Sequence, residues 1–354
     1  MKSRREIQRT FLCTEVTKRQ IVGQKVGYSA LVNDIIAMTM EMERHEGHFA
    51  SQIGETTLGM LMAYREYGVL SRTFMLEEHS KMLEEIRSHS GTFSKFSESE
   101  LAFAEGRVYV ELVERVCQLI EDFSTLCYAL WNDLSDFPKN ILQSPSSEKL
   151  LKELAGQERW FILLRYPVLD TLQFSAEDKE FLRQHYERNI RVLLNFTKVL
   201  EDFIKLHGIF YTKHKHGNPL VYGIRKIEFG GEPTIIIPAF YDSKQPEILT
   251  GIPIAYSWYK KQRKIVNTVI NLMNDLLDRA VLFIESDGKP IIEHISRYKM
   301  NDDATQRLQS LNKEYSKNVK CTPIEVTMKI VVPGKVLRRF SQFYDNLDLG
   351  AFDT

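Results

Sequence analysis

The sequence predicts a mainly α-helical protein, a long-helix bundle with a small β element in its C-terminal third. Three long segments, near 98–133, 176–216 and 257–285, repeat apolar residues at the spacing of one helix face. Two segments rich in β-branched residues, 221–241 and 325–332, predict a hairpin and a strand. Among 354 residues, 43% are apolar and 27% charged, which is ordinary globular composition. The chain therefore has enough apolar surface for a large core.

The length exceeds that of one ordinary domain, so we expect two domains or one large domain with an appendage. The sequence itself divides into three parts. Residues 1–96 form an N-terminal basic arm followed by helices, residues 97–220 form the helical-bundle core, and residues 221–354 hold the hairpin, a long helix and a C-terminal strand.

The N-terminal part begins with a basic segment, since residues 1–27 hold seven Lys or Arg against two Glu. Within it, 10–16 has β character and could form an edge strand. Residues 28–50 space their apolar residues as a helix does, and 57–88 predicts one or two further helices. Gly68 is expected to interrupt the second of these stretches.

Two of the long helices are preceded by helix-capping sequences. Ser97 and Glu100 have the spacing of a capping box, in which each side chain bonds the other residue's backbone N–H. Ser175 and Asp178 repeat this pattern before the second long helix. Both helices carry continuous apolar stripes, so we expect them to pack against each other. A short helix over 148–154 should lie between them.

The last third changes character after Pro219. Gly230 to Pro233 lies between two β-rich runs, 221–229 and 234–240, and favours a hairpin there. The third long helix should end at 287–290, where Asp-Gly-Lys-Pro stops a helix.

Charge and cysteine content exclude several classes of protein. Lys plus Arg and Asp plus Glu both number 47, so no overall field attracts nucleic acid or membranes. Residues 205–354, however, hold 22 basic and 16 acidic side chains, a net of +6, which favours an anionic partner for this part. The four cysteines lack zinc-site spacing and are expected to be reduced and buried. No apolar run is long enough to span a membrane, so we expect a cytoplasmic protein.

The end of the second long helix concentrates polar chemistry. At 100° per residue, His207, Tyr211 and His214 share the apolar face, whereas Lys213 and His216 point the opposite way. One interpretation is a helix end whose cations meet the negative end of the helix dipole. The other is a cationic pocket that binds phosphate, with His216 as an acid or base. The candidate catalytic residues are His216, Lys215, Lys213 and Tyr211.

Tyr-x-x-x-Lys-His-Gly at the end of a long helix, followed by a hairpin, resembles a motif of HEPN (higher eukaryotes and prokaryotes nucleotide-binding) domains. In active HEPN ribonucleases an arginine and a polar residue precede a histidine. Here Tyr211 stands in the arginine position, Thr212 in the polar one and His216 in the histidine one. The resemblance covers at most 98–240 and implies a dimerising bundle of stress or phage-defence systems. Because the arginine is replaced, we expect binding rather than metal-independent RNA cleavage.

One other pair fits the loose HEPN spacing. Arg72 and His79, with Thr73 beside the arginine, would lie two turns apart on one helix face. The alternative is an ordinary exposed helix face.

A second cationic cluster lies at the start of the third long helix. It places four cations in five residues where the helix dipole disfavours positive charge. If the hairpin folds back, further cations of 213–226 come near, and neighbouring aromatic residues would suit single-stranded RNA. A solvated surface turn is the alternative. The candidate ligand-binding residues are His207, His214, Arg225, Lys226, Lys260, Lys261, Arg263 and Lys264.

We expect no metal and no cofactor, because residues 41–48 lack a metal-binding histidine pattern and no phosphate-binding glycine loop occurs. The first functional hypothesis is a non-catalytic protein whose basic C-terminal surface binds RNA, a nucleotide phosphate or an acidic protein. The alternatives are a degenerate HEPN-like ribonuclease and a structural bundle that forms homodimers.

Overall fold

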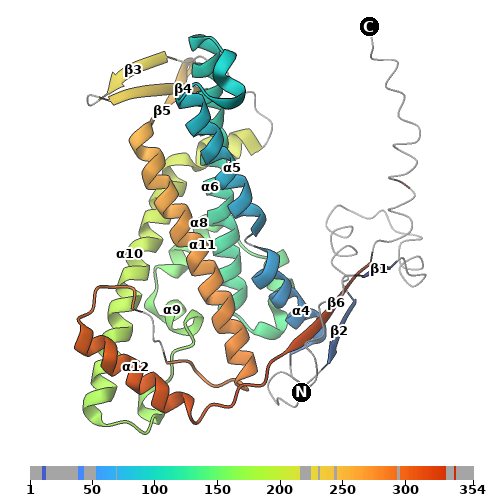
Figure 1. Cartoon of the computed structure of the whole chain (residues 1–354), viewed down its shortest axis with the longest axis vertical. Coiled ribbons are helices and arrows are strands. Elements are labelled where there is room, and N and C mark those ends of the chain that lie inside the picture. Colours follow the sequence, from blue (N-terminus) through green and yellow to red (C-terminus); the bar gives the residue numbers. More distant parts are fainter. Residues whose placement is uncertain are drawn as a thin grey trace.

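A computed structural model describes residues 10–12, 39–43, 53–68, 70–215, 225–229, 232–242, 245–292, 296–331 and 339. The described chain is mainly helical, as the sequence predicts (Figure 1). Its α-helices are α4 (Glu55–Ala63), α5 (Leu70–Arg87), α6 (Glu98–Trp131), α7 (Phe137–Leu142), α8 (Ser147–Leu154), α9 (Gln157–Leu163), α10 (Ala176–Lys215), α11 (Tyr256–Glu285) and α12 (Asp302–Ser316). Tyr64–Gly68 forms a π-helical turn between α4 and α5, so the helix is interrupted where Gly68 predicts it.

Helix α6 is the spine of the bundle. Its start is the predicted capping box: the Ser97 N–H donates to Glu100 Oε2 at 2.7 Å, and the Glu100 N–H donates to Ser97 Oγ at 3.4 Å. All of the predicted apolar stripe of this helix is buried. Helices α5, α7, α8, α9, α10 and α11 all contact α6, and the longest of them run beside it in Figure 1. The core therefore forms around this one helix.

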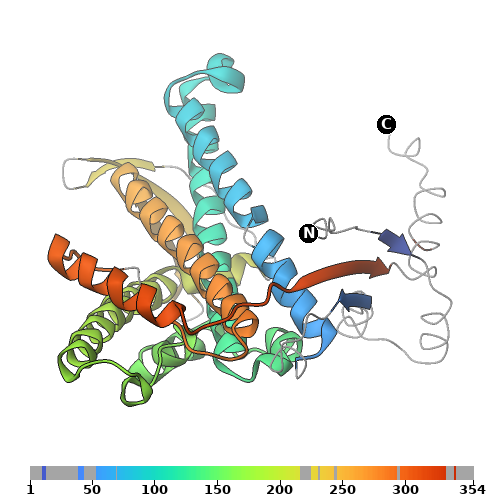
Figure 2. The same ribbon diagram turned by 60° about the horizontal axis from the view of Figure 1, so that its bottom comes forward.

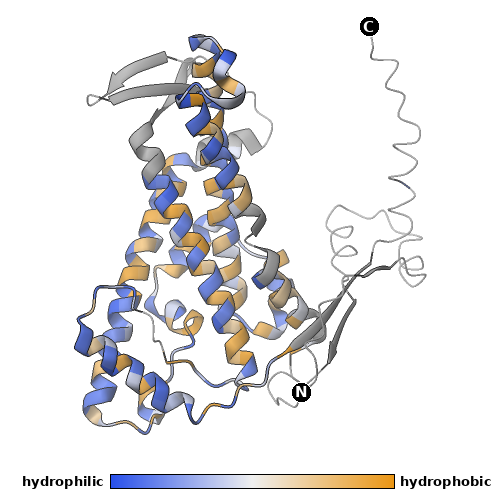
Figure 3. Cartoon of the chain, viewed as in Figure 1, coloured by the Kyte–Doolittle hydropathy of each residue, from blue (hydrophilic) through white to orange (hydrophobic). Residues whose placement is uncertain are grey.

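Helix α10 covers a second side of the spine. Ser175 Oγ accepts from the Asp178 N–H at 3.1 Å, which satisfies a donor at the start of the helix. Arg307 of α12 donates to Asp178 Oδ1 at 2.7 Å and so ties α12 across this end of the bundle (Figure 2). The contact between α6 and α10 confirms that the two striped helices pack together. In Figure 3 the long helices carry both apolar and polar residues, as amphipathic helices do.

Helix α11 covers a third side. Strand β5 (Gln245–Ala255) leads directly into it. Its end follows the predicted stop, since Asp287 and Gly288 take left-handed backbone angles, φ 58° and 73°. The strands β3 (Arg225–Phe229), β4 (Glu232–Asp242) and β5 form an antiparallel sheet in the order β3-β4-β5. β4 contacts α10 and β5 contacts α11, so this sheet lies where α10 ends and α11 begins (Figure 1).

A second sheet joins segments from both ends of the sequence. Strand β6 (Glu325–Val331) pairs in parallel with β1 (Thr10–Leu12) and antiparallel with β2 (Thr39–Glu43). The sequence prediction of a helix over 28–50 is therefore wrong for residues 39–43. Thr-Met-Glu-Met-Glu alternates in character at period two, which suits a strand.

Helix α12 was not predicted from the sequence. Within it only Leu308 and Leu311 are buried, so its apolar stripe is short. A start signal was available, because the Asn301 side chain accepts from the Ala304 N–H at 2.9 Å as an N-cap.

The described cysteines carry free thiols, and Cys117 and Cys127 are buried as expected. The expectation of burial is wrong for Cys321, which is exposed. Among the residues described here, no helix combines the length and apolar character needed to cross a membrane.

Candidate functional site

Several predicted site residues are not described by the structure, or are described only by their backbone. His216 is outside the described residues. For Lys213, His214 and Lys215 the structure describes only their backbone in α10, and for Arg225 and Lys226 only their backbone in β3. Lys260 is likewise placed only as part of α11.

His207 and Tyr211 lie on the buried face of α10, together with Leu200 and Phe203, as the helical spacing predicts. The His207 side chain is 6% exposed, its ring centroid lies 4.4 Å from that of Phe203, and Nδ1 has no hydrogen-bond partner among the described residues. Burial lowers the pKa of His207 to about 4, so the ring is neutral at neutral pH. The prediction that His207 contributes to an accessible basic surface is therefore not supported by its position in the core.

Tyr211 is tied to the spine helix. It is 5% exposed, and its hydroxyl donates to Glu121 Oε2 of α6 at 2.7 Å. Burial, helped by the hydrogen bond to Glu121, raises the pKa of Tyr211 well above its usual value. A neutral tyrosine held in this way joins α10 to α6, and it does not carry the positive charge that an arginine has.

The second HEPN-like pair falls on α5. His79 Nδ1 lies 2.6 Å from the Met75 carbonyl oxygen, and Nε2 lies 3.4 Å from Glu111 Oε2 of α6. Arg107 pairs with the other oxygen of Glu111 at 2.6 Å. These contacts link α5 to α6, and the Arg72 side chain is outside the description. His79 is thus engaged in helix packing.

Three described cations gather near the start of α11, and we call them the α11 basic surface: Lys261, Arg263 and Lys264. All three are exposed. Arg263 Nη1 lies 3.9 Å from Glu84 Oε1 of α5, with both side chains more than half exposed, which makes this a weak pair. Within the described part of the chain, no carboxylate pairs with Lys261 or Lys264. The cationic cluster predicted from the sequence is therefore accessible in its described members.

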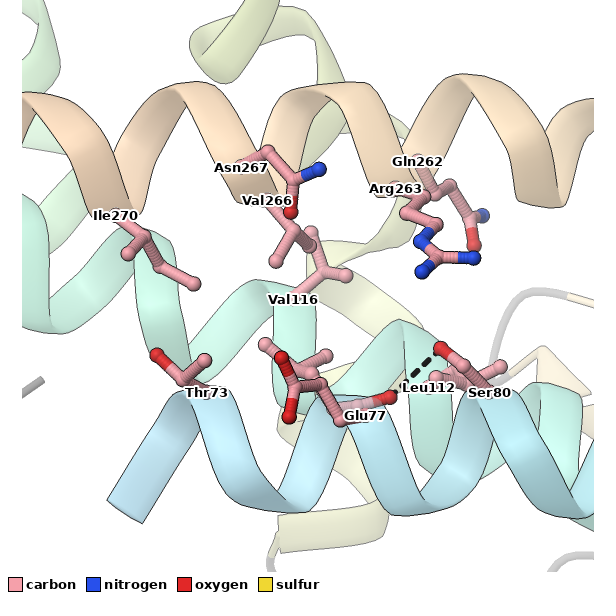
Figure 4. Close-up of a pocket in the computed structure, with 11 residues that line it drawn as sticks. Thr73, Glu77, Ser80, Leu112, Val116, Gln262, Arg263, Val266, Asn267 and Ile270 are labelled. Atoms are coloured by element: carbon pink, nitrogen blue, oxygen red, sulfur yellow. Dashed lines mark hydrogen bonds between the residues drawn. The ribbon is translucent and has the colours of Figure 1, made fainter. Parts of the chain in front are cut away.

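A pocket of about 60 Å³ lies beside this surface, where α5, α6 and α11 meet (Figure 4). We call it the α5–α11 pocket. Its apolar walls are Leu76, Leu112, Val116, Val266 and Ile270. Its polar groups are Thr73, Glu77, Ser80, Gln262, Arg263 and Asn267.

Gln262 is the unusual member of the α5–α11 pocket. It is 8% exposed, and its Oε1 atom is buried without a hydrogen-bond partner in the described structure. The Ser80 hydroxyl, by contrast, donates to the Leu76 carbonyl oxygen at 2.7 Å. In Figure 4, Glu77 on α5 faces Asn267 and Arg263 on α11 across the pocket. The pocket thus combines aliphatic walls, one unsatisfied acceptor and one charge of each sign.

Sequence reasoning found the cations but missed the pocket. Gln262 continues the buried stripe of Val266 and Val269 toward the start of α11, and this spacing was the available signal. The α5 wall comes from a distant part of the sequence, so only the packing of α5 on α6 brings it to α11.

A buried polar cluster elsewhere has a structural role. His185 is 1% exposed, and its ring nitrogens lie 3.0 Å from the Tyr298 hydroxyl and 3.2 Å from Asn189 Nδ2. The Arg297 N–H donates to Asn189 Oδ1 at 2.9 Å. Burial lowers the pKa of His185 to about 4. These contacts fasten the segment before α12 to α10. No group of metal-binding side chains occurs among the described residues.

Comparison of the chain with protein-family models, with curated proteins and with solved structures finds no match. The HEPN resemblance therefore stays a prediction.

Proposed function

We propose that the protein binds a phosphate-rich chain, with single-stranded RNA as the test ligand, on the α11 basic surface. The observation that carries the proposal is the exposure of Lys261, Arg263 and Lys264 near a helix start, with no described carboxylate paired to either lysine. The first turn of α11 also lacks an acidic residue. Mutual repulsion among three clustered cations is unfavourable by itself, and a bound anion would relieve it.

A phosphate chain fits this surface better than an acidic protein does. The neighbouring α5 presents exposed carboxylates, including Glu77, Glu78 and Glu84. A protein interface covers about 800 Å² on each partner, so an acidic protein on α11 would meet these carboxylates as well. A single strand of RNA is narrow enough to place its phosphates on α11 and away from these carboxylates. We expect such a protein in the cytoplasm, where RNA is available.

Of the predicted catalytic residues, Tyr211 is the one whose side chain is described, and its burial supports a proposal of binding rather than catalysis. Tyr211 and His207 are buried, and His207 is neutral at neutral pH. Neither residue offers an accessible acid or base for RNA cleavage.

The test is the salt dependence of binding, measured by fluorescence anisotropy with a labelled RNA of mixed sequence. Each phosphate contact contributes about −0.7 to the slope of log K against log salt for single strands. The three cations predict a slope of about −2, and Lys261→Gln with Lys264→Gln should reduce it to about −0.7. The matched control replaces two exposed lysines of α7 and α8, Lys139→Gln with Lys152→Gln, and should leave the slope unchanged.

Three outcomes would contradict the proposal. Wild type that binds no RNA even at low salt would leave only a scaffold role. An equal loss of slope in the control pair would show nonspecific attraction. Competition by poly-glutamate as strong as that by RNA of equal charge would favour an acidic protein partner.

A further inference from the structure

We propose that the α5–α11 pocket receives one base of the bound strand and prefers bases that carry an exocyclic amino group. This inference rests on the proposed function, since the α11 basic surface would hold the phosphates on either side of that base.

The walls of the α5–α11 pocket fit a flat, mostly apolar group. Leu112 and Val116 of α6 form the floor and are 3% and 1% exposed, and Leu76 and Val266 on the flanking helices are each 6% exposed. A space of about 60 Å³ corresponds to roughly four to six water positions. A ring that displaces such waters from aliphatic walls gains about 25 cal/mol for each Å² of apolar surface buried.

The Gln262 side chain offers an unsatisfied hydrogen-bond acceptor to a ligand in this pocket. Gln262 Oε1 is buried without a donor, and a buried acceptor in this state costs about 1–3 kcal/mol. An N–H group of a ligand in the pocket would remove that cost. A glutamine carboxamide pairs well with an adenine, accepting from its amino group and donating to the neighbouring ring nitrogen.

The wall opposite Gln262 carries a second hydrogen-bond acceptor. Glu77 lines the pocket from α5, facing α11 in Figure 4. A carboxylate accepts from the amino group of cytosine. Uracil instead presents a carbonyl oxygen at that position, and this oxygen would face the Glu77 carboxylate without a shared proton. The two acceptors therefore select adenine and cytosine over uracil.

The α5–α11 pocket adjoins the α11 basic surface, which would bind the phosphates. Gln262 lies between Lys261 and Arg263 in the sequence of α11, and Arg263 itself lines the pocket. A base beside Gln262 thus has a neighbouring phosphate within reach of Arg263, which lines the same pocket. The same chemistry would accept the base of a free mononucleotide, so the experiment separates the two sources.

The experiment compares 5′-labelled oligonucleotides of adenosine, cytidine and uridine of equal length by anisotropy at low salt. We expect the adenosine and cytidine oligomers to bind about tenfold more tightly than the uridine oligomer. Gln262→Ala should remove the preference for adenosine and leave uridine binding unchanged. In this variant the cost of the lost side-chain packing is offset by the removal of an unsatisfied buried acceptor, so we expect it to stay folded.

A second variant tests the pocket without altering a buried residue. Asn267 is exposed at the rim. Asn267→Trp should cover the opening and reduce adenosine and cytidine binding to the level of uridine. Asn274→Trp, at an exposed position of α11 seven residues further along and outside the pocket, is the matched control and should have no effect.

The outcomes separate this inference from the proposed function. Equal binding of all three oligomers, sensitive to Lys261→Gln with Lys264→Gln but not to Gln262→Ala, would overturn the pocket and keep the basic surface. Adenosine monophosphate binding that Gln262→Ala abolishes, without binding of any oligomer, would support the pocket with a free nucleotide as its ligand. If neither oligomers nor mononucleotide bind, both proposals fail.

Discussion

Protonation of His207 is expected to destabilise the fold. The ring is 6% exposed between α10 and the core, and its pKa is lowered by burial from 6.5 to about 4. Because the unfolded chain binds a proton at a higher pH than the folded chain does, the folded state loses stability as the pH falls from about 6.5 to about 4. Above about pH 6.5 the neutral, buried His207 makes its full contribution to the free energy of unfolding.

The magnitude follows from the two pKa values of His207. One pKa unit corresponds to about 1.4 kcal/mol, so the full loss below pH 4 is about 3 kcal/mol. Between pH 7 and pH 5 the loss is about 2 kcal/mol. His185 has a similar lowered pKa and should add a comparable loss. Replacing one of the two histidines should therefore remove about half of the acid destabilisation.

The assay is urea unfolding followed by far-ultraviolet circular dichroism at pH 7 and pH 5. His207→Leu should retain the free energy of unfolding at pH 7, since it removes an unsatisfied buried nitrogen, and should lose about 2 kcal/mol less than wild type at pH 5. The control is His89→Asn, at an exposed position with φ 51° that asparagine tolerates. A His207→Leu variant with the same pH dependence as wild type would refute the neutral, buried state of this ring.

Two further substitutions test the packing of the spine helix. Tyr211→Phe should lower the free energy of unfolding by about 1.5–3 kcal/mol, because it removes a hydrogen bond to the charged Glu121, and a double-mutant cycle with Glu121→Gln should return a coupling of at least 0.5 kcal/mol. RNA affinity should be unchanged in Tyr211→Phe, and a specific loss would instead assign this hydroxyl to the binding site. Leu119→Ala, at a fully buried position of α6, should cost about 2–5 kcal/mol in urea unfolding, whereas Leu206→Ala, at a position 71% exposed, should stay within about 0.5 kcal/mol; equal costs would place the core elsewhere.

The long helices could be predicted because their signals are local. Ser97 and Glu100 mark the start of α6 within four residues of sequence, and Asp287 with Gly288 marks the end of α11. For residues 39–43 the local prediction was wrong. The spacing of apolar residues over 28–50 predicted a helix, whereas residues 39–43 form a strand that pairs with β6. Strand pairing depends on a partner far away in the sequence, which local spacing does not reveal.

The candidate site was predictable only in part for the same reason. Helical spacing correctly placed His207 and Tyr211 on the apolar face of α10. It could not tell that α5 and α11 approach each other over α6, and so it gave no hint that Glu77 and Gln262 line one pocket. The charge run at 260–264 was visible in the sequence, but the absence of described carboxylate partners for Lys261 and Lys264 required the packed structure.

The central position of α6 has a consequence during synthesis. The helix is complete at Trp131, whereas α11, which covers one of its sides, begins only at Tyr256. At 5–20 residues per second, the ribosome needs about 6–25 s to make the intervening segment of roughly 125 residues. For that time the side of α6 that α11 will cover stays exposed on the nascent chain. We therefore expect this side of α6 to be an aggregation-prone surface of the nascent chain until α11 has emerged.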